Sequence, residues 1–378
     1  MSNPPKNEYC PDYVSAPGET LREMLEERGV SQAELALRTG RPKKTISEIV
    51  NGKAAITPET ALQFELVLGV PAEFWSARER HYREYLARLA EARALEQQAK
   101  WAQKFPVREM RRRRWLRGDD SPAGVVRELL QFYGVASPGQ WESVAERQRA
   151  CFRKPAAFRS DPYALSAWLR QGVRVGQAVT CAPFHKRRFT ESLSRARELT
   201  RERPEVFCGE LVKLCAEAGV AVAFVPELPK SRASGATRWL SPRKALIQLS
   251  FRYRSDDQLW FTFFHEAGHI ILHGKKAIYI EAMKQGGPHE EAADRFAADF
   301  LIPGNQYKKL RANSMFTRDL VAGFARKIGV APGIVVGRLQ YDGLLAHNRL
   351  NGLKRYFAWS PSETSHCTAE VCPRGPGS

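Results

Sequence analysis

The segment FTFFHEAGHIILHG at residues 261–274 decides how the C-terminal half of this chain is interpreted. It places His265, Glu266 and His269 inside a run of phenylalanine, isoleucine and leucine. The pattern predicts a helix over Asp257–His273, on which the two histidines project from one face because they are four residues apart. Two neutral imidazoles at this spacing can hold one zinc ion. Burying three polar groups without a partner would be costly, which favours a metal site.

The three residues form the pattern His-Glu-x-x-His, and its chemistry follows from the residue types. Zinc lowers the pKa of water, and Glu266 can take a proton from that water and pass it to a leaving amine. Chance alone produces the pattern in about one per cent of chains of this length, so its apolar setting has to support it. The other interpretation is a core helix with misplaced polarity.

A catalytic zinc needs a third protein ligand, and the segment HEEAADRFAADFLIP at residues 289–303 offers one. We expect a helix over His289–Ile302 with Glu290 as the ligand and Glu291 as its competitor. Asp294, one turn beyond Glu290, can accept the other ring N–H of a ligand histidine and so orient that ring.

Other polar residues near the motif receive plainer interpretations. His273 and His289 are more typical of helix ends than of metal ligands. Tyr279, Tyr307 and His273 are candidates for stabilising the oxyanion of a tetrahedral intermediate, and the sequence does not choose among them.

Composition limits the class of protein. The 378 residues suggest two or three domains, and 43% hydrophobic residues are enough for ordinary cores. The net charge of +18 indicates a polyanionic partner, with nucleic acid as the first candidate and an arginine-rich surface as the alternative. Seven cysteines without a Cys-x-x-Cys pair indicate neither a zinc finger nor a disulfide framework. Without an apolar signal or spanning run, we expect a cytoplasmic protein with reduced thiols and no membrane partner.

The N-terminal region predicts short helices separated by turns. The segments are GETLREMLEERG, SQAELALRTG, RPKKTISEIVNGK and TPETALQFELVLGV. Ser31 and Glu34 have the spacing of a capping box at the start of the second helix. Such a unit is typical of a helix-turn-helix that lays its third helix in the DNA major groove. The candidate DNA contacts are Gln32, Lys43, Lys44, Thr45 and Ser47.

We expect a mainly α fold with a small α+β domain. Strand-like segments occur only after residue 218: GVAVAFVPEL, KALIQLS and SGATRWLSP, of which the last is predicted as an edge strand. The KALIQLS segment is a candidate edge strand for an extended peptide. The run at Arg111–Arg114 is interpreted as a solvated helix end, with a phosphate contact as the alternative.

The expected organisation has five parts. They are a flexible arm (1–17), a helix-turn-helix domain (18–95), a helical intermediate region (96–204), a metallopeptidase domain (205–350) and a disordered tail (351–378).

The N-terminal unit resembles the Xre-type helix-turn-helix family and, within it, the HigA-like antitoxins. The resemblance covers residues 18–90 and rests on SQAELALRTG, ISEIVNGKAAITPETALQFELVLGV and PAEFW. It implies binding to a DNA operator, usually as a homodimer on an inverted repeat.

Residues 205–345 are similar to the ImmA/IrrE family of gluzincin-like zinc metallopeptidases. The matching elements are FTFFHEAGH, then Glu290-x-x-Ala293-Asp294-x-Phe296-Ala297, then LIP. The resemblance implies an endopeptidase with one Zn²⁺ per chain, favours Glu290 over Glu291, and implies a repressor or antitoxin as the substrate. A preceding helix-turn-helix departs from the family's pattern, so the target could be a partner or the chain itself.

Two hypotheses follow. The first is a cytoplasmic transcriptional regulator that joins a DNA-binding head to a zinc endopeptidase. The second is a non-enzymatic, HigA-like repressor or antitoxin of a toxin–antitoxin pair, in which zinc has a structural or sensory role.

Overall fold

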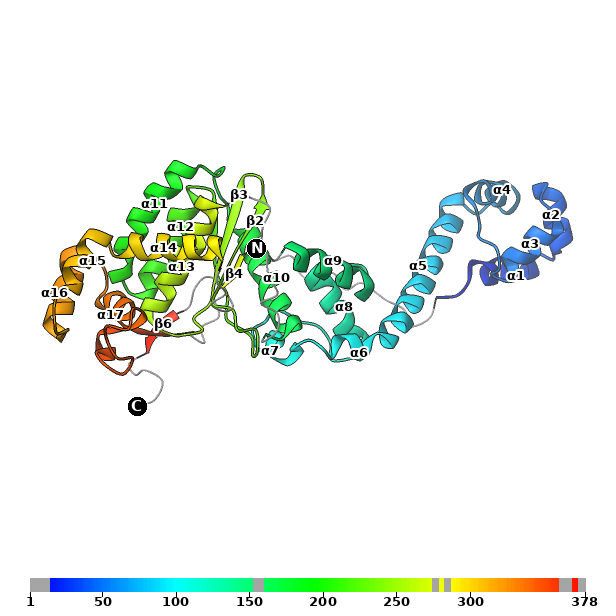
Figure 1. Cartoon of the computed structure of the whole chain (residues 1–378). Coiled ribbons are helices and arrows are strands. Elements are labelled where there is room, and N and C mark those ends of the chain that lie inside the picture. The colour runs from blue at the N-terminus through cyan, green and yellow to red at the C-terminus, as the bar shows by residue number, and fades with distance from the viewer. Residues whose placement is uncertain (1–13, 152–159, 274–278, 282–286, 360–368, 373–378) are drawn as a thin grey trace. The chain divides into compact units, whose positions relative to one another are not determined.

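The computed structural model describes residues 14–151, 160–273, 279–281, 287–359 and 369–372. Most of these residues are helical, with a small sheet in the C-terminal half (Figure 1). The expectation of a mainly α chain with a small α+β domain is therefore confirmed. The chain separates into two compact units, residues 1–98 and 99–378, which are described in turn.

The first unit contains the expected short helices and one long one. They are α1 (Pro17–Glu27), α2 (Gln32–Thr39), α3 (Lys43–Val50), α4 (Pro58–Leu68) and α5 (Ala72–Gln97). The side chain of Ser31 caps α2 by accepting from the backbone N–H of Glu34 at 3.1 Å. Gly40 ends α2 with φ +64°, the left-handed conformation that lets the chain turn sharply into α3. The core is formed by fully buried side chains that include Leu21, Leu35, Ile46, Phe64 and Trp75.

The second unit begins with the helices of the expected intermediate region. They are α6 (Ala99–Ala102), α7 (Val107–Arg112), α8 (Pro122–Tyr133), α9 (Pro138–Cys151), α10 (Pro162–Ala178), α11 (Lys186–Glu198), the 3₁₀ turn η2 (Leu199–Arg201) and α12 (Pro204–Ala216). Helix α10 packs on the sheet, because Trp168 Nε1 donates to the carbonyl of Val225 at 3.0 Å and Gln248 Nε2 donates to the carbonyl of Trp168 at 2.7 Å. The intermediate helices thus belong to the same compact unit as the sheet.

The sheet has the order β1-β3-β2-β4. Its strands are β1 (Val220–Phe224), β2 (Gly235–Ser241), β3 (Lys244–Leu249) and β4 (Tyr279–Glu281). Strands β1 and β3 are parallel, and the other pairs are antiparallel.

Two strand predictions are wrong. β2 was expected at the edge but pairs with β3 on one side and β4 on the other. β3, proposed as an edge for a peptide, lies between β1 and β2. Both errors arise because pairing depends on partners distant in the sequence, which strand propensity does not report.

The remaining helices follow the sheet. They are α13 (Asp256–Leu272), α14 (Pro288–Leu301), α15 (Gly304–Arg311), α16 (Arg318–Ile328) and α17 (Pro332–Tyr341). The predicted helices over Asp257–His273 and His289–Ile302 are therefore found within one residue at each end. Helix α13 lies in the main core, where Trp260, Phe263 and Phe264 are fully buried.

The expected tail is partly ordered. Within 351–378 the structure contains the 3₁₀ turn η3 (Asn351–Leu353) and the antiparallel pair of β5 (Tyr356–Trp359) and β6 (Ala369–Cys372). Phe357 is fully buried in the core, so the prediction of disorder is wrong for this part. The composition of the tail did not predict this order, because one buried aromatic residue and a short strand pairing are enough to anchor a polar segment. The other tail residues, and residues 1–13 of the expected arm, lie outside the described ranges.

Two of the four arginines in the basic run at Arg111–Arg114 are held by contacts with other elements. Arg111 pairs with Asp120 and with Glu128, the latter at 3.0 Å. Arg113 donates to the carbonyl of Glu227 at 2.6 Å and is half-buried. The prediction of a solvated helix end is therefore wrong for these two residues, because their partners come from other elements.

Cysteine chemistry also differs from expectation. Cys208 is disulfide-bonded, whereas Cys181 and Cys215 are free thiols. Sequence spacing missed this bond because a disulfide requires two side chains to meet in space, not a particular separation along the chain.

No single helix in the described ranges is long and apolar enough to cross a membrane. Helices α16 and α17 pass that length and composition test only as a pair, with a bend of 113° between them.

Candidate functional site

Helix α13 brings its polar residues into the core against β2. Glu266 is fully buried, and its backbone oxygen accepts a hydrogen bond from Thr237 Oγ1 at 3.1 Å. Gly235 lies two residues before Thr237 and therefore on the same face of β2. Its lack of a side chain leaves room for the Glu266 carboxylate. A Cβ at position 235 would lie 2.7 Å from Glu266 Oε1 and 2.5 Å from Thr262 Cγ2. The sheet therefore fixes where this carboxylate can lie.

Helices α13 and α14 run beside each other and supply the rest of the site (Figure 1). A Cβ on Gly268 would lie 3.3 Å from Ala293 Cα and 3.1 Å from Phe296, so the absence of a side chain allows a close approach of the helices. Gly268 therefore faces α14, on the side of α13 where the two helices meet.

Three ligand-type atoms converge between these helices. The Nε2 atoms of His265 and His269 are 3.0 Å apart. Glu290 Oε2 lies 3.2 Å from His265 Nε2 and 3.6 Å from His269 Nε2. The histidines are almost completely buried and Glu290 is about one-third exposed, with a side-chain exposure of 36%. Glu291, the competing carboxylate, is exposed to solvent.

Asp294 orients the first histidine. Its Oδ1 lies 2.8 Å from His265 Nδ1, and because a carboxylate only accepts, Nδ1 carries the hydrogen. The lone pair of His265 is then on Nε2, facing His269 and Glu290. A ring held in this tautomer is ready to bind a cation.

The donor set fits zinc. Ligands of a tetrahedral zinc at bond lengths of about 2.0–2.1 Å are about 3.3 Å from one another. The separations of 3.0, 3.2 and 3.6 Å lie around that value. One carboxylate and two imidazoles also leave a fourth position for a water or substrate, as catalytic zinc sites do.

The electrostatics favour the protonation states that metal ligands require. Burial, the largest cause, lowers the pKa of His269 to about 4, so its imidazole is neutral at pH 7. Burial by itself would raise the pKa of Glu290, but the influence of the adjacent His265 and His269 outweighs it and holds the pKa at about 2. A neutral histidine and an ionised glutamate are the ligand forms.

The three candidates for oxyanion stabilisation lie in different surroundings. Tyr307 donates to Asp342 Oδ2 at 2.6 Å and stacks beneath Arg338, so its hydroxyl is committed elsewhere. Tyr279 lies on β4 opposite Thr237, and its side chain is outside the described structure. His273 contacts His289, where α13 ends and α14 begins.

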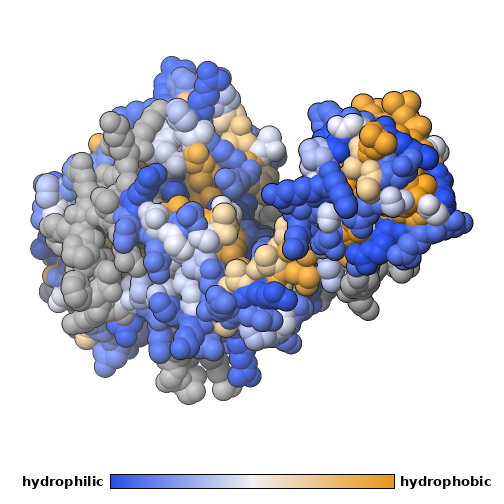
Figure 2. All heavy atoms as spheres, turned by 90° about the vertical axis from the view of Figure 1, so that its right-hand side faces the viewer, coloured by the Kyte–Doolittle hydropathy of each residue, from blue (hydrophilic) through white to orange (hydrophobic). Residues whose placement is uncertain are grey.

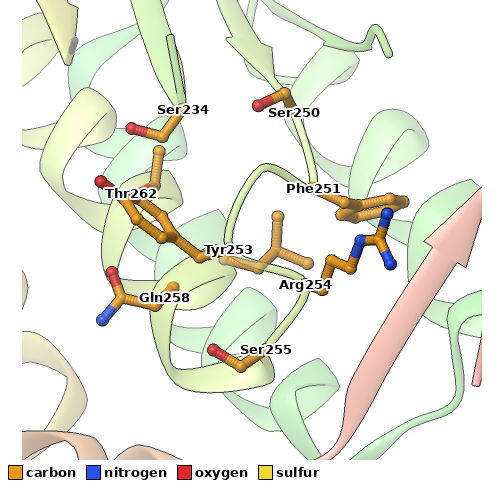
Figure 3. Close-up of a pocket in the computed structure, with 9 residues that line it drawn as sticks. Ser234, Ser250, Phe251, Tyr253, Arg254, Ser255, Gln258 and Thr262 are labelled. Carbon is orange, nitrogen blue, oxygen red and sulfur yellow. The ribbon is translucent and has the colours of Figure 1, made fainter. Parts of the chain in front are cut away.

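A small cavity lies one helical turn before Glu266. Figure 3 shows it between the end of β3 and the first turns of α13, with Gln258 and Thr262 projecting from the helix and Ser234 facing them from the start of β2. Its lining combines hydroxyl and amide side chains with the apolar Phe251 and Leu259.

In the first unit, α3 presents the expected candidate residues. Lys43 and Lys44 are exposed, and Thr45 and Ser47 are half-exposed, while Ile46 and Ile49 face the core. Lys44 lies 3.8 Å from Glu48, a weak exposed pair that leaves the lysine available. Gln32 is half-exposed at the start of α2.

Family models match both units. Residues 219–340 match the IrrE N-terminal-like domain, Peptidase_M78, and residues 21–75 match the helix-turn-helix domain HTH_3. The chain therefore joins a helix-turn-helix domain to a Peptidase_M78 domain.

Named proteins and solved structures that resemble this chain match the first of those domains. The chain is 37% identical over 59 residues to the HTH-type transcriptional regulator YddM of Escherichia coli (strain K12), which is 16% of this chain and 63% of that regulator. It is 28% identical to the Pseudomonas aeruginosa antitoxin HigA with its higBA promoter and to an addiction module antidote protein of a HigA family from Coxiella burnetii. Each match covers 22% of this chain and 94% or 92% of the other, with TM-scores of 0.22 and 0.21.

Sequence reasoning missed two contributors to the Peptidase_M78 site. Gly235 and Thr237 lie on β2, far from the motif in sequence, and contact Glu266 from the sheet. The available signal was the glycine itself, because glycine inside a strand often marks a close approach by another group.

Proposed function

We propose that this protein is a DNA-binding transcriptional regulator whose Peptidase_M78 domain is a zinc-dependent endopeptidase. The observation that carries the proposal is the convergence of His265 Nε2, His269 Nε2 and Glu290 Oε2, which lie within 4.8 Å of one another. Asp294 contributes by holding the ring of His265 through its contact with Nδ1.

Each residue has a defined task in the proposed reaction. His265, His269 and Glu290 would hold one zinc ion, and Asp294 keeps His265 in the required tautomer. Zinc supplies a Lewis acid that polarises a peptide carbonyl and acidifies water. Glu266 takes a proton from the attacking water and delivers it to the leaving amine. Its burial against β2 keeps it aimed at one place.

The change Glu266→Gln tests the catalytic role. A glutamine fits the same space but cannot take a proton, so we expect zinc content to remain near one per chain while cleavage falls by about 10²–10⁴-fold. Zinc is measured by elemental analysis, and cleavage by comparing new N-termini in cells that express each variant. Glu291→Gln is the matched control and should behave as wild type. Unchanged cleavage in Glu266→Gln would refute the peptidase proposal.

The metal ligands have a separate test. His265→Ala or His269→Ala should each lose the zinc, because two remaining ligands hold it poorly. A chain that keeps one zinc after either change does not use this site.

For the first unit, we propose that Lys43, Lys44, Thr45 and Ser47 of α3 and Gln32 of α2 contact an operator. The double change Lys43→Ala with Lys44→Ala removes two exposed charges and leaves the α3 core intact. We expect weaker binding and a salt slope lower by about two, one for each lost phosphate contact. The control is Lys308→Ala with Lys309→Ala, exposed lysines on α15 of the second unit. Operator binding that is unchanged would refute the assignment of α3.

The substrate class and assembly are part of the proposal. Cleavage of a repressor or antitoxin-type protein in the cytoplasm would link the peptidase to the DNA-binding head. A homodimer on an inverted repeat is favoured by Leu62 and Leu66 of α4, which are 56% and 85% exposed one turn apart. Figure 2 shows hydrophobic patches on an otherwise largely hydrophilic face.

The alternative is a non-enzymatic repressor or antitoxin in which zinc is structural or sensory. Its support is the similarity of residues around the helix-turn-helix to proteins described as antitoxins. Under this alternative, His265→Ala impairs operator control, whereas Glu266→Gln has no effect on any protein in the cell.

A further inference from the structure

The C-terminal end of α13 and the N-terminal end of α14 are joined by a pair of histidines. His273 ends α13, and its Nε2 lies 3.0 Å from the backbone oxygen of His289 in the first turn of α14. The Nδ1 atoms of the two rings are 2.8 Å apart, with ring centroids separated by 4.2 Å. One imidazole therefore contacts both the main chain and the side chain of His289.

The hydrogen positions follow from the acceptor. A carbonyl oxygen only accepts, so His273 Nε2 carries a hydrogen and donates it to His289. In the neutral ring Nδ1 is then an acceptor, and His289 Nδ1–H donates to it. The two contacts form one consistent hydrogen-bonded unit without any added charge.

The pair adjoins the metal ligands on both helices. His273 follows His269 by one turn, with ring centroids 5.2 Å apart, and His289 immediately precedes Glu290. Three of the contacts between the helices follow one another along α13, at His273 with His289, at Gly268 with Ala293, and at His265 with Asp294. The first of these fixes the turn from which Glu290 extends.

We propose that His273 and His289 are positioning residues that hold Glu290 in place as the third zinc ligand. The proposal rests on the zinc site proposed above. Losing a group that orients a ligand typically weakens metal binding by about 10–100-fold. We expect losses in this range for His273→Ala, because both hydrogen bonds disappear, and a smaller loss for His289→Ala, which keeps the backbone carbonyl.

Zinc affinity in the full chain, measured by competition with a chromophoric chelator, provides the test. The double variant His273→Ala with His289→Ala should bind zinc no more weakly than His273→Ala alone, because the residues act as one unit. His273→Gln should recover part of the affinity, since its amide can donate to the carbonyl that Nε2 reaches. His347→Ala, which removes an exposed imidazole elsewhere, is the matched control.

A spectroscopic readout separates positioning from general damage to the fold. With Co²⁺ in the site, the visible d–d bands of His273→Ala should shift, and those of His273→Gln should return toward wild type. The proposal is overturned if the losses of zinc affinity in His273→Ala and His289→Ala multiply in the double variant. It is also overturned if the Co²⁺ spectrum of His273→Ala is unchanged. Two zinc ions in wild type and one in His273→Ala also overturn it, since the pair would then be a second metal site. Wild-type protein that binds no zinc instead refutes the proposed function.

Discussion

At the scale of single residues, the candidate site depends as much on missing side chains as on polar ones. Gly268 allows α14 to approach α13, and Gly235 leaves the space that the Glu266 carboxylate occupies. The motif identifies residue types, but the direction of each group is set by what surrounds it. Asp294 illustrates this, because it selects the tautomer of His265 from another helix.

Gly235→Ala is predicted to displace Glu266. The added Cβ would meet Thr262 Cγ2 at 2.5 Å and Glu266 Oε1 at 2.7 Å, so either the helix or the carboxylate must move. We expect a loss of about 1–3 kcal/mol in the free energy of unfolding and a large loss of cleavage. Zinc content should be retained. Urea denaturation and the cleavage assay measure these effects.

The control for this prediction is Gly209→Ala in α12, where a Cβ meets no other atom within 4 Å. That change should leave cleavage unaltered and raise the free energy of unfolding slightly, because alanine has a higher helix propensity than glycine. If Gly235→Ala cleaves as well as wild type, the space at position 235 has no role in aiming Glu266.

At the scale of elements, the first turn of α13 is held by the C-terminal segment. Lys354 Nζ lies 2.6 Å from Asp257 Oδ2, and Arg355 Nε lies 3.5 Å from Asp256 Oδ2. Arg355 also donates to the carbonyls of Arg201 and Glu202, at 2.9 Å each. Negative charge at a helix N-terminus interacts favourably with the helix dipole. The positive charges of Lys354 and Arg355 offset the repulsion between the two carboxylates when both are ionised. A segment that looked disordered thus anchors the helix that carries the candidate site.

A pH-dependent effect on stability is expected from Asp256. Burial, reinforced by Asp257 and opposed by Arg355, raises the pKa of Asp256 to about 7. Between about pH 4 and 7 the folded chain keeps this proton while the unfolded chain releases it, so rising pH removes stability through this group. Asp256→Asn cannot ionise and escapes that loss.

The stability difference, variant minus wild type, should therefore become more favourable to Asp256→Asn as pH rises from 4 to 7. Urea denaturation at several pH values measures it, with Asp319→Asn, an exposed carboxylate in the first turn of α16, as the control. A difference that is constant over this range, or that changes in the opposite direction, contradicts the prediction.

At the scale of the whole molecule, the two units have separate cores, and the functions proposed for them are separate as well. The proposed zinc ligands all lie in residues 99–378, and the proposed DNA contacts all lie in residues 1–98. Metal removal should then affect only the second unit directly, because ligand binding stabilises the part that binds it.

Chelation of zinc is predicted to lower the unfolding temperature of the second unit. At a free zinc concentration 1,000 times the dissociation constant, the lost stabilisation is about 4 kcal/mol. Calorimetry with and without chelator measures the shift, and operator binding at fixed salt serves as the internal control. A parallel loss of operator binding would show that the units are coupled through the metal.

The sequence predicted the bounds of helices much better than it predicted which segments contact one another. The bounds of α13 and α14 were anticipated to within a residue, because helical periodicity and proline positions are local signals. The place of β2 within the sheet was missed, as were the partners of Arg111 and Arg113. Those features depend on contacts between segments far apart in the chain.

By itself, the sequence determined the helical character of both units, the face shared by His265 and His269, and the exposed lysines of α3. These follow from a repeat of 3.6 residues per turn and need no knowledge of the rest of the chain. Glu290 was already the expected third ligand, but only the tertiary structure decided how closely it approaches the two histidines. Only the tertiary structure decided, too, that Gly235 makes room for Glu266. The physical reason is that a binding site is a set of distances between elements, and packing alone fixes those distances.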